Sequence, residues 1–322
     1  MNRARLAILV VLVFGSVLSH CPRAFAWGCE GHQTVALIAK QNLNPHALAM
    51  VNQILTDNPI DPTLDRFCKP VATDPIEDAA TWADDYRKGH PETAGWHFID
   101  IPRGAAKGTY RCDAVQSCIT LALSEQVKIL KDPASGPAAR ANALRFIIHF
   151  AGDIHQPLHC TTNNDRGGNC VPVTYFGQKP LETDQITKTY QLNLHGVWDT
   201  QLVERIAGSE TVEQFAAAIE KRFKPQFATW KEEGVNFDNW AWESHEAAEQ
   251  TTYGALNRKI PVEKPEPVNS CADADEISER MLKLREKVGP QYQTFVSRTI
   301  EEQLAKAGFR LAMILNQIWP AA

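Results

Sequence analysis

The sequence predicts a mainly α-helical protein that folds as one domain with at most a small β-hairpin. Helical patterns cover most of the chain, strand signals are few, and no internal repeat or low-complexity segment interrupts the pattern. The runs that suit a hairpin are 171–176 and 188–192. The helical patterns lie over residues 32–56, 75–89, 117–131, 138–155, 195–206, 210–230, 240–257 and 274–317.

Proline and glycine set the boundaries of several of these elements. Pro157 ends or kinks the helix predicted over 138–155, and Gly289-Pro290 divides the last helical pattern into two helices. The segment IPVEKPEPVNS at 260–270 is typical of an exposed loop. No GxxxxGK loop or dinucleotide fingerprint is present, so the sequence gives no support for a nucleotide-cofactor enzyme.

Residues 1–26 have the features of a secretory signal peptide. Two arginines precede the apolar run 6–18, which is too short to span a bilayer comfortably, and residues 24–26 form a small-x-small cleavage pattern. We therefore expect a secreted or periplasmic protein without a membrane anchor, whose mature chain starts at Trp27. The 322 residues less these 26 leave 296, enough for one large core.

The stretch IIHFAGDIHQPLH carries the strongest chemical signal. His149 and Asp153 are four residues apart, so on a helix they share a face and can converge on one metal ion. The proline that follows places His159 within reach of the same site. Further on, LHGVWDTQL repeats the spacing with His195 and Asp199. Imidazole and carboxylate ligands without thiolates favour a catalytic zinc over a structural one.

Further candidate ligands lie upstream. TWADDYR offers Asp84 or Asp85 and GWHFID offers His97, although adjacent acids are often a solvated helix face and a histidine between aromatic residues is often a buried one. His155 lies six residues after His149 on another face, and we interpret it as a hydrogen-bonding group behind the ligands. No ligand spacing is recognisable for the remaining histidines of the mature chain, His46, His90 and His245.

Removal of the signal peptide would create one more set of ligand atoms. A free amine at Trp27, the carbonyl of the same residue and His32 together could chelate a metal ion. With the two HxxxD clusters and the upstream residues, a polymetal hydrolytic site is the leading hypothesis.

Six motifs occur in the order in which the S1/P1 nuclease family carries them. The chain therefore resembles this family of zinc-dependent single-strand nucleases and 3′-nucleotidases, and the similarity extends to about Asn316 through WAWESHEAA and GFRLAMILN. The resemblance implies a helical fold like that of P1 nuclease and zinc phospholipase C, with one trinuclear zinc nuclease domain over 27–322. The motifs are WGCEGH (27–32), WADDYR (82–87), WHFID (96–100), HFAGDIHQPLH (149–159), DRGGN (165–169) and NLHGVWD (193–199).

The resemblance also implies a role for each matching residue. It implies that Asp84, not Asp85, is a metal ligand and that Asp153 bridges two metal ions. Both aspartates would be catalytic residues. Arg87 would be the third catalytic residue and would bind the scissile phosphate. The base or nucleotide site would be formed by Phe98, Asp100, Gly167, Gly168 and Asn169. The three zinc ions would be held by Asp84, His97, His149 and Asp153, by His159, His195 and Asp199, and by Trp27, His32 and Asp153.

The implied reaction is hydrolysis of single-stranded DNA and RNA to 5′-phosphate products, with 3′-nucleotides also accepted. Clustered zinc lowers the pKa of bound water toward about 7 and offsets charge on the phosphate oxygens. Loss of the signal peptide removes three arginines and no acid, which changes the formal net charge from −5 to −8. An acidic chain without a basic stripe is not typical of duplex binders, whereas stacking on aromatic residues requires exposed bases.

Seven cysteines remain after signal removal, and export favours disulfides. We predict the local pairs Cys112–Cys118 and Cys160–Cys170. Of the other three, Cys29 with Cys68 is a guess, and one thiol, by this assignment Cys271, stays free or pairs between chains.

Two rival functions stay open at this point. A zinc phospholipase C-type phosphodiesterase would have a related fold and metal site, although the DRGGN and WHFID motifs favour nucleotides. A secreted zinc-binding protein without catalysis would not need Arg87. We expect a monomer, and released nucleotides or released phosphocholine would distinguish these functions.

Overall fold

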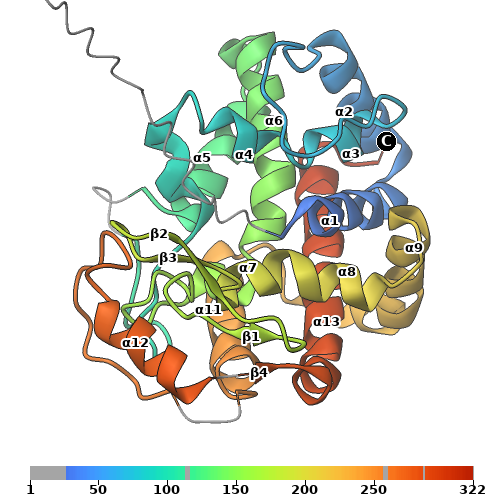
Figure 1. The fold of residues 1–322 in the computed structure, drawn as a ribbon. Coiled ribbons are helices and arrows are strands. Elements are labelled where there is room, and N and C mark those ends of the chain that lie inside the picture. The colour runs from blue at the N-terminus through green and yellow to red at the C-terminus, as the bar shows by residue number, and fades with distance from the viewer. Residues whose placement is uncertain (1–26, 113–116, 257–259, 286, 322) are drawn as a thin grey trace, which may run out of the picture.

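The computed structural model describes residues 27–112, 117–256, 260–285 and 287–321, and helices dominate it (Figure 1). The signal peptide prediction over 1–26 lies outside the described residues. The α-helices are α1 (Cys29–Asn42), α2 (Pro45–Asp57), α3 (Pro75–Ala79), α4 (Trp82–Tyr86), α5 (Ile119–Lys131), α6 (Pro137–Asp153), α7 (Leu194–Gly196), α8 (Leu202–Ala207), α9 (Val212–Phe223), α10 (Phe227–Glu232), α11 (Phe237–Ala247), α12 (Asp275–Leu284) and α13 (Pro290–Ile318). The 3₁₀ turns are η1 (Pro91–His97), η2 (Pro133–Ser135), η3 (Pro157–Cys160) and η5 (Lys224–Gln226), and the π-helical turns are η4 (Val197–Gln201) and η6 (Ala248–Thr252).

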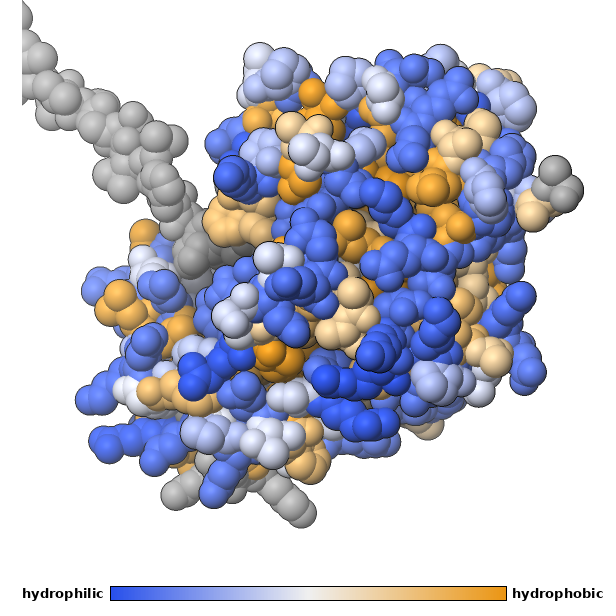
Figure 2. Space-filling model, turned by 90° about the vertical axis from the view of Figure 1, so that its right-hand side faces the viewer, coloured by the Kyte–Doolittle hydropathy of each residue, from blue (hydrophilic) through white to orange (hydrophobic). Residues whose placement is uncertain are grey.

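Two helices form the centre of the molecule. α6 and α13 lie against each other, with α5 packed on α6 and α1 packed on α13 (Figure 1). α6 and α13 both begin with proline in the first turn, where the missing N–H costs nothing. From residue 143 to its end, α6 is buried on every side, so the polar residues on its last turns are enclosed by protein. Hydrophilic side chains cover most of the face shown in Figure 2.

The predicted helical regions are confirmed, but several are divided into shorter helices. The pattern over 32–56 is interrupted at Asn44, whose side chain accepts from Ala47 N and caps α2. The pattern over 75–89 contains α3 and α4, and that over 195–206 contains a π-helical turn between α7 and α8. The division at Gly289-Pro290 is as predicted. None of the helices in the described residues combines the length and apolar character that a membrane span needs.

The small sheets differ from the predicted hairpin. The run 188–192 does form a strand, β3 (Thr189–Gln191), but it pairs antiparallel with β2 (Leu181–Asp184). The other run contains β1 (Thr174–Tyr175), which pairs in parallel with β4 (Lys287–Val288) from the far end of the chain. The prediction that 171–176 pairs with 188–192 is therefore right only in part. The two strands have other partners, but next to them Pro172 and Asn193 form an isolated antiparallel bridge, and Val173 N donates to Leu192 O at 2.8 Å.

The disulfides confirm two predicted pairs and correct the third. Cys29 bonds to Cys68 and Cys112 to Cys118. Cys170 bonds to Cys271, not to Cys160.

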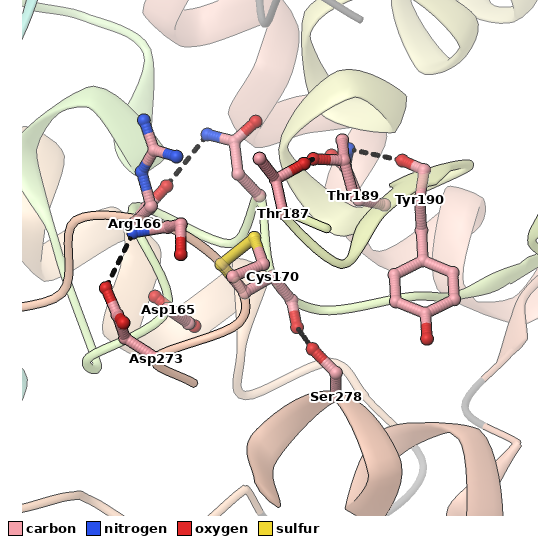
Figure 3. Close-up of a disulfide and its surroundings, with 12 residues drawn as sticks. Asp165, Arg166, Cys170, Thr187, Thr189, Tyr190, Asp273 and Ser278 are labelled. Carbon is pink, nitrogen blue, oxygen red and sulfur yellow. Dashed lines mark hydrogen bonds between the residues drawn. A yellow bond between two sulfur atoms is a disulfide. The ribbon is translucent and has the colours of Figure 1, made fainter. Parts of the chain in front are cut away.

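Cys160 is the free cysteine of the described residues, and the turn that carries it explains why it is unbonded. η3 keeps Cys160 close to the end of α6, where its buried thiol donates to Ile154 O at 3.4 Å. Cys170 faces the segment before α12, and Ser278 Oγ donates to its carbonyl oxygen (Figure 3). The two side chains therefore point to different parts of the core.

Candidate metal centre

Ligand-type side chains from separate segments converge at the last turns of α6. α6 itself contributes His149 and Asp153, whose four-residue spacing places both on one face, as predicted. The other segments are α1, α4, the end of η1, η3, α7 and η4. In that order they contribute His32, Asp84, His97, His159, His195 and Asp199, all of them buried.

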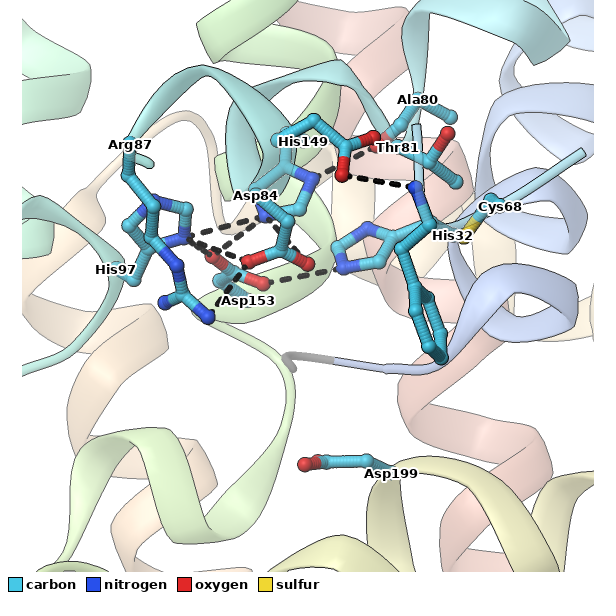
Figure 4. Close-up of polar contacts among 12 residues, drawn as sticks. His32, Cys68, Ala80, Thr81, Asp84, Arg87, His97, His149, Asp153 and Asp199 are labelled. Carbon is cyan, nitrogen blue, oxygen red and sulfur yellow. Dashed lines mark hydrogen bonds and ion pairs between the residues drawn. The ribbon is translucent and has the colours of Figure 1, made fainter. Parts of the chain in front are cut away.

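The geometry divides these residues into three groups, each with ligand atoms within 4.8 Å of one another. His32, His149 and Asp153 form one group, and Asp84, His97 and His149 form the next. The last consists of His159, His195 and Asp199, with His195 Nε2 at 3.2 Å from Asp199 Oδ2. All five residues of the first two groups can be followed in Figure 4, together with Asp199.

Asp153 connects the first two groups because its two oxygens face different histidines. Oδ1 lies 3.3 Å from His32 Nε2, whereas Oδ2 lies 2.9 Å from His97 Nδ1 and 3.2 Å from His149 Nε2. A carboxylate in this position can bridge two cations (Figure 4).

Three of the histidines are each oriented by a different backbone carbonyl oxygen. His149 Nδ1 contacts Ala80 O at 2.7 Å, His159 Nδ1 contacts His97 O at 2.8 Å, and His195 Nδ1 contacts Gly167 O at 2.7 Å. Because a carbonyl can only accept, each Nδ1 carries a proton, and Nε2 is the ring nitrogen that faces the centre and could bind a metal ion. A backbone carbonyl behind a histidine is the usual support of a metal ligand.

Many polar atoms of the centre are buried and lack a hydrogen-bond partner, which is the strongest sign that a cation belongs there. Burying such atoms without a partner destabilises a protein, so native structures rarely leave several together. Burial also raises the pKa of the Asp199 carboxyl well above its usual range, despite a hydrogen bond from Gln156. The atoms without a hydrogen bond are His32 Nδ1 and Nε2, Asp84 Oδ1, His97 Nε2, Asp153 Oδ1, His159 Nε2 and Asp199 Oδ2.

The electrostatics agree with a cation-binding centre. Burial lowers the pKa of His97 to about 4, and burial together with His159 lowers that of His195 to about 3, so both rings are neutral and can bind metal at neutral pH. His149 differs: although burial opposes it, the carboxylates of Asp153 and Asp84 raise its pKa to about 9. The negative charge that holds a proton on His149 is the charge that a metal ion would neutralise.

The two adjacent aspartates of α4 have different surroundings. Asp84 faces the centre and lies 3.2 Å from Arg87 Nη2. Asp85 faces away from it and accepts from Arg66 Nε, while Lys88 Nζ lies 3.0 Å from its carboxylate. The arrangement matches the choice of Asp84 over Asp85 as the residue nearest the centre.

Trp27 is fixed beside the third predicted ligand set. Its indole is fully buried and donates from Nε1 to Gly152 O at 2.9 Å. The next residue, Gly28, donates its backbone N–H to Asp199 O at 2.6 Å. The residue at which we expect the mature chain to begin is therefore held between α6 and the HxxxD turn of Asp199.

The predicted base-binding residues lie on two segments next to the centre. Phe98 directly follows His97 and is 40 % exposed, and Asn169 is half-buried. Water reaches Asp100, yet burial together with the charge of Asp165 raises its carboxyl pKa to about 6. The raised pKa and the exposure together indicate a carboxyl group at the protein surface that is surrounded by protein on most sides and open to solvent on one.

Sequence reasoning missed the residues that hold the glycine-rich loop. Buried Asp165 accepts from Asn163 N, Gly168 N and Tyr253 Oη, the last at 2.8 Å. A Cβ at Gly167 would lie 2.4 Å from Leu158 O, so glycine is needed there. Asp165 belongs to the DRGGN motif, but nothing in the sequence indicates its hydrogen bond to Tyr253.

His155 does not support the ligands in the way that we predicted. Its Nδ1 contacts Ala151 O at 2.8 Å and its Nε2 accepts from Arg310 Nη1 at 3.0 Å. The ring therefore joins the end of α6 to α13. Gln156, which sequence reasoning passed over, is the residue that contacts a candidate ligand, because its Nε2 donates to Asp199 Oδ1 at 2.5 Å.

Comparison with known proteins gives a consistent result. The family model described as S1/P1 nuclease matches residues 27–320. Nuclease S1 of Aspergillus oryzae is 26 % identical over 320 residues, which cover 95 % of this chain and 96 % of that protein. Nuclease P1 of Penicillium citrinum is 28 % identical over 302 residues, covering 91 % and 97 %. Endonuclease 2 of Arabidopsis thaliana is 25 % identical over 241 residues, covering 70 % and 74 %.

Proposed function

Because the chain belongs to the S1/P1 nuclease family and is therefore a phosphodiester-hydrolysing enzyme, we propose that it cleaves single-stranded DNA and RNA with zinc. The products would carry 5′-phosphates, and 3′-nucleotides would be substrates as well. The observation that carries this proposal is the set of buried nitrogen and carboxylate oxygen atoms without a hydrogen bond at the end of α6. Nitrogen and oxygen donors without thiolate are the ligands of catalytic zinc.

We assign three zinc ions to the ligand groups. Asp153 would bridge two of them, since its two oxygens face His32 on one side and His97 with His149 on the other. The free amine and the carbonyl of Trp27 would complete the ligands around His32. The first ion would be held by Asp84, His97, His149 and Asp153, the second by His159, His195 and Asp199, and the third by Trp27, His32 and Asp153.

The protein's own residues would bind and orient the phosphate. Bound zinc supplies positive charge for the phosphate oxygens and lowers the pKa of water at the site. Arg87 lies 3.2 Å from Asp84 and would place a guanidinium against the phosphoryl group, the geometry that arginine favours. Asp84 would then hold both a metal ion and this arginine, which ties phosphate binding to metal binding.

The base of the substrate would lie between Phe98 and the glycine-rich loop. Asp100 and Asn169 would supply polar groups for the base edge, and the Phe98 ring a stacking surface. The backbone of Gly167 and Gly168 would approach the nucleotide closely, as residues without Cβ can. Stacking needs an unpaired base, which supports a preference for single strands.

Export would prepare the centre. We propose that residues 1–26 are a signal peptide and that residues 27–322 form the secreted or periplasmic, monomeric enzyme. Three disulfides in the described residues suit an oxidising compartment. Cleavage after Ala26 would release the amine of Trp27, which is already fixed beside His32 by its buried indole.

Metal analysis of the mature protein, combined with digestion of single- and double-stranded DNA, tests the proposal. About three zinc ions per chain and faster release of acid-soluble nucleotides from the single strand are expected. Asp153→Asn should lose at least one zinc and most activity, because the bridge would lose half of its compensating charge. A fully zinc-loaded protein without nuclease activity, or Asp153→Asn with unchanged zinc and turnover, would contradict it.

A further inference from the structure

The loop before α3 presents an aromatic ring on a tightly held backbone. Phe67 is 60 % exposed, one of the most exposed large apolar side chains of the described residues. The residue before it, Arg66, is almost buried and donates to Asp85 at 3.2 Å and to Thr81 Oγ1 at 3.0 Å. A ring whose backbone is already ordered loses little conformational entropy when a ligand stacks on it.

The bonds of this loop tie Phe67 to the helices that carry ligands of the metal centre. Its backbone N–H donates to Asp85 Oδ1 at 3.0 Å, and Asp85 is the neighbour of the candidate ligand Asp84. The next residue, Cys68, is bonded to Cys29, which lies one helical turn before His32 on α1. Phe67 is thus anchored to both helices that carry ligands on this side of the centre.

Resting on the function proposed above, we propose that Phe67 is a stacking platform for the base on the 3′ side of the scissile phosphate. Hydrolysis to a 5′-phosphate breaks the bond to the 3′-oxygen of one nucleoside, and the phosphate stays on the next one. The first nucleoside occupies the site of Phe98 and Asp100, which extends from His97. The second nucleoside leaves the centre on the side of α1 and α4, where Phe67 lies.

The chemistry of the chain favours stacking as the means of holding this second nucleoside. The mature chain would carry a formal net charge of −8, so its overall charge does not attract a polyanion. Two of the nearby cations are committed to protein carboxylates: Arg66 to Asp85 and Asp78, and Lys88 to Asp85. An aromatic face binds any base without sequence preference, which suits a nuclease that meets mixed sequences.

The experiment compares Phe67→Ala with Phe295→Ala in the mature, zinc-loaded enzyme. Phe295 is 58 % exposed on α13, so it controls for loss of an equally exposed phenylalanine. A dinucleotide carries both bases, whereas a 3′-mononucleotide lacks the base that would reach Phe67. Phe67→Ala should raise KM for the dinucleotide about tenfold, the scale of one base–aromatic stack, and change the 3′-mononucleotide less than twofold.

Two further measurements separate stacking from a structural effect. Phe67→Trp should restore the low KM for the dinucleotide, and a 5′-mononucleotide, which keeps the base in question, should inhibit Phe67→Ala more weakly than the wild type. Equal losses on both substrates, or a dinucleotide KM equal to that of Phe295→Ala, would overturn the platform. A wild type that cleaves neither substrate would instead overturn the proposed function.

Discussion

Gly152→Ala tests whether the space beside α6 is reserved for a metal ligand. Gly152 precedes Asp153 in the helix, and a Cβ built on it would lie 2.8 Å from His32 Nδ1 and 3.0 Å from His32 Cε1. The indole of Trp27 lies on the same side, with Cδ1 at 3.6 Å. The substitution therefore adds a methyl group where His32 now packs against α6.

The structure gives the size of the effect. To reach ordinary contact at about 3.4 Å, the His32 ring must move by about 0.6 Å, whereas metal–ligand distances tolerate about 0.2 Å. Alanine in a helix interior would by itself stabilise the fold by about 1 kcal/mol. Overpacking costs about 1–3 kcal/mol, so the net change in unfolding free energy lies between about zero and 2 kcal/mol.

Zinc stoichiometry and melting temperature separate loss of metal from loss of packing. Gly152→Ala should retain about two of three zinc ions and lose most activity on single-stranded DNA, with only a small change in apo-protein stability. Gly308→Ala is the control, because its Cβ would meet Ile38 Cβ at 2.5 Å in the core between α13 and α1. It should lower the melting temperature more than Gly152→Ala does and lose less zinc. A Gly152→Ala protein with three zinc ions and full activity would refute the reasoning.

Three other predictions concern metal removal, the N-terminus and pH. EDTA should lower the melting temperature and abolish activity together, because metal binding contributes to folding here; unchanged melting after complete zinc removal would count against this. A methionine left before Trp27 should reduce zinc from about three ions to two and depress activity while the fold survives, because a peptide nitrogen is not a basic ligand; equal zinc and activity would remove Trp27 from the site. Burial and Asp165 raise the pKa of Asp100 to about 6, so its carboxylate forms as pH rises through that value, and KM for a 3′-nucleotide should fall from pH 5 to pH 7. Asp100→Asn should flatten that pH dependence, and parallel profiles for both proteins would exclude the role.

Local spacing accounts for what could be predicted of the centre. His149 with Asp153 and His195 with Asp199 need only helical geometry, and the structure places each pair on one turn, with lone pairs facing inward. The helices themselves follow from periodicity and proline. The meeting of His32 and Asp153 depends on tertiary packing, because the two residues lie on different helices. The residues alone made a shared metal site conceivable, and the family resemblance specified which residues meet.

Features that join distant residues could not be predicted. β1 pairs with β4 over more than a hundred residues, and Cys170 bonds to Cys271 across a separation of 101. For Cys170, a partner ten residues away looked favourable because short loops close easily. The turn η3 prevents that pairing, since it directs Cys160 into the core, and no local pattern reveals this direction.

The packing of α1 on α13 has a consequence for when the enzyme can acquire its metals. Asn44, just after α1, donates from its backbone N–H to Asn316 Oδ1 at 2.8 Å, and Asn316 Nδ2 donates to Asn42 O at 3.0 Å. The helix that carries His32 is thus seated by α13, which is synthesised about 270 residues after it, and contacts of such separation form slowly. Zinc loading at His32 should consequently be a late, post-translocational event, and a chain truncated before α13 should fail to retain that ion.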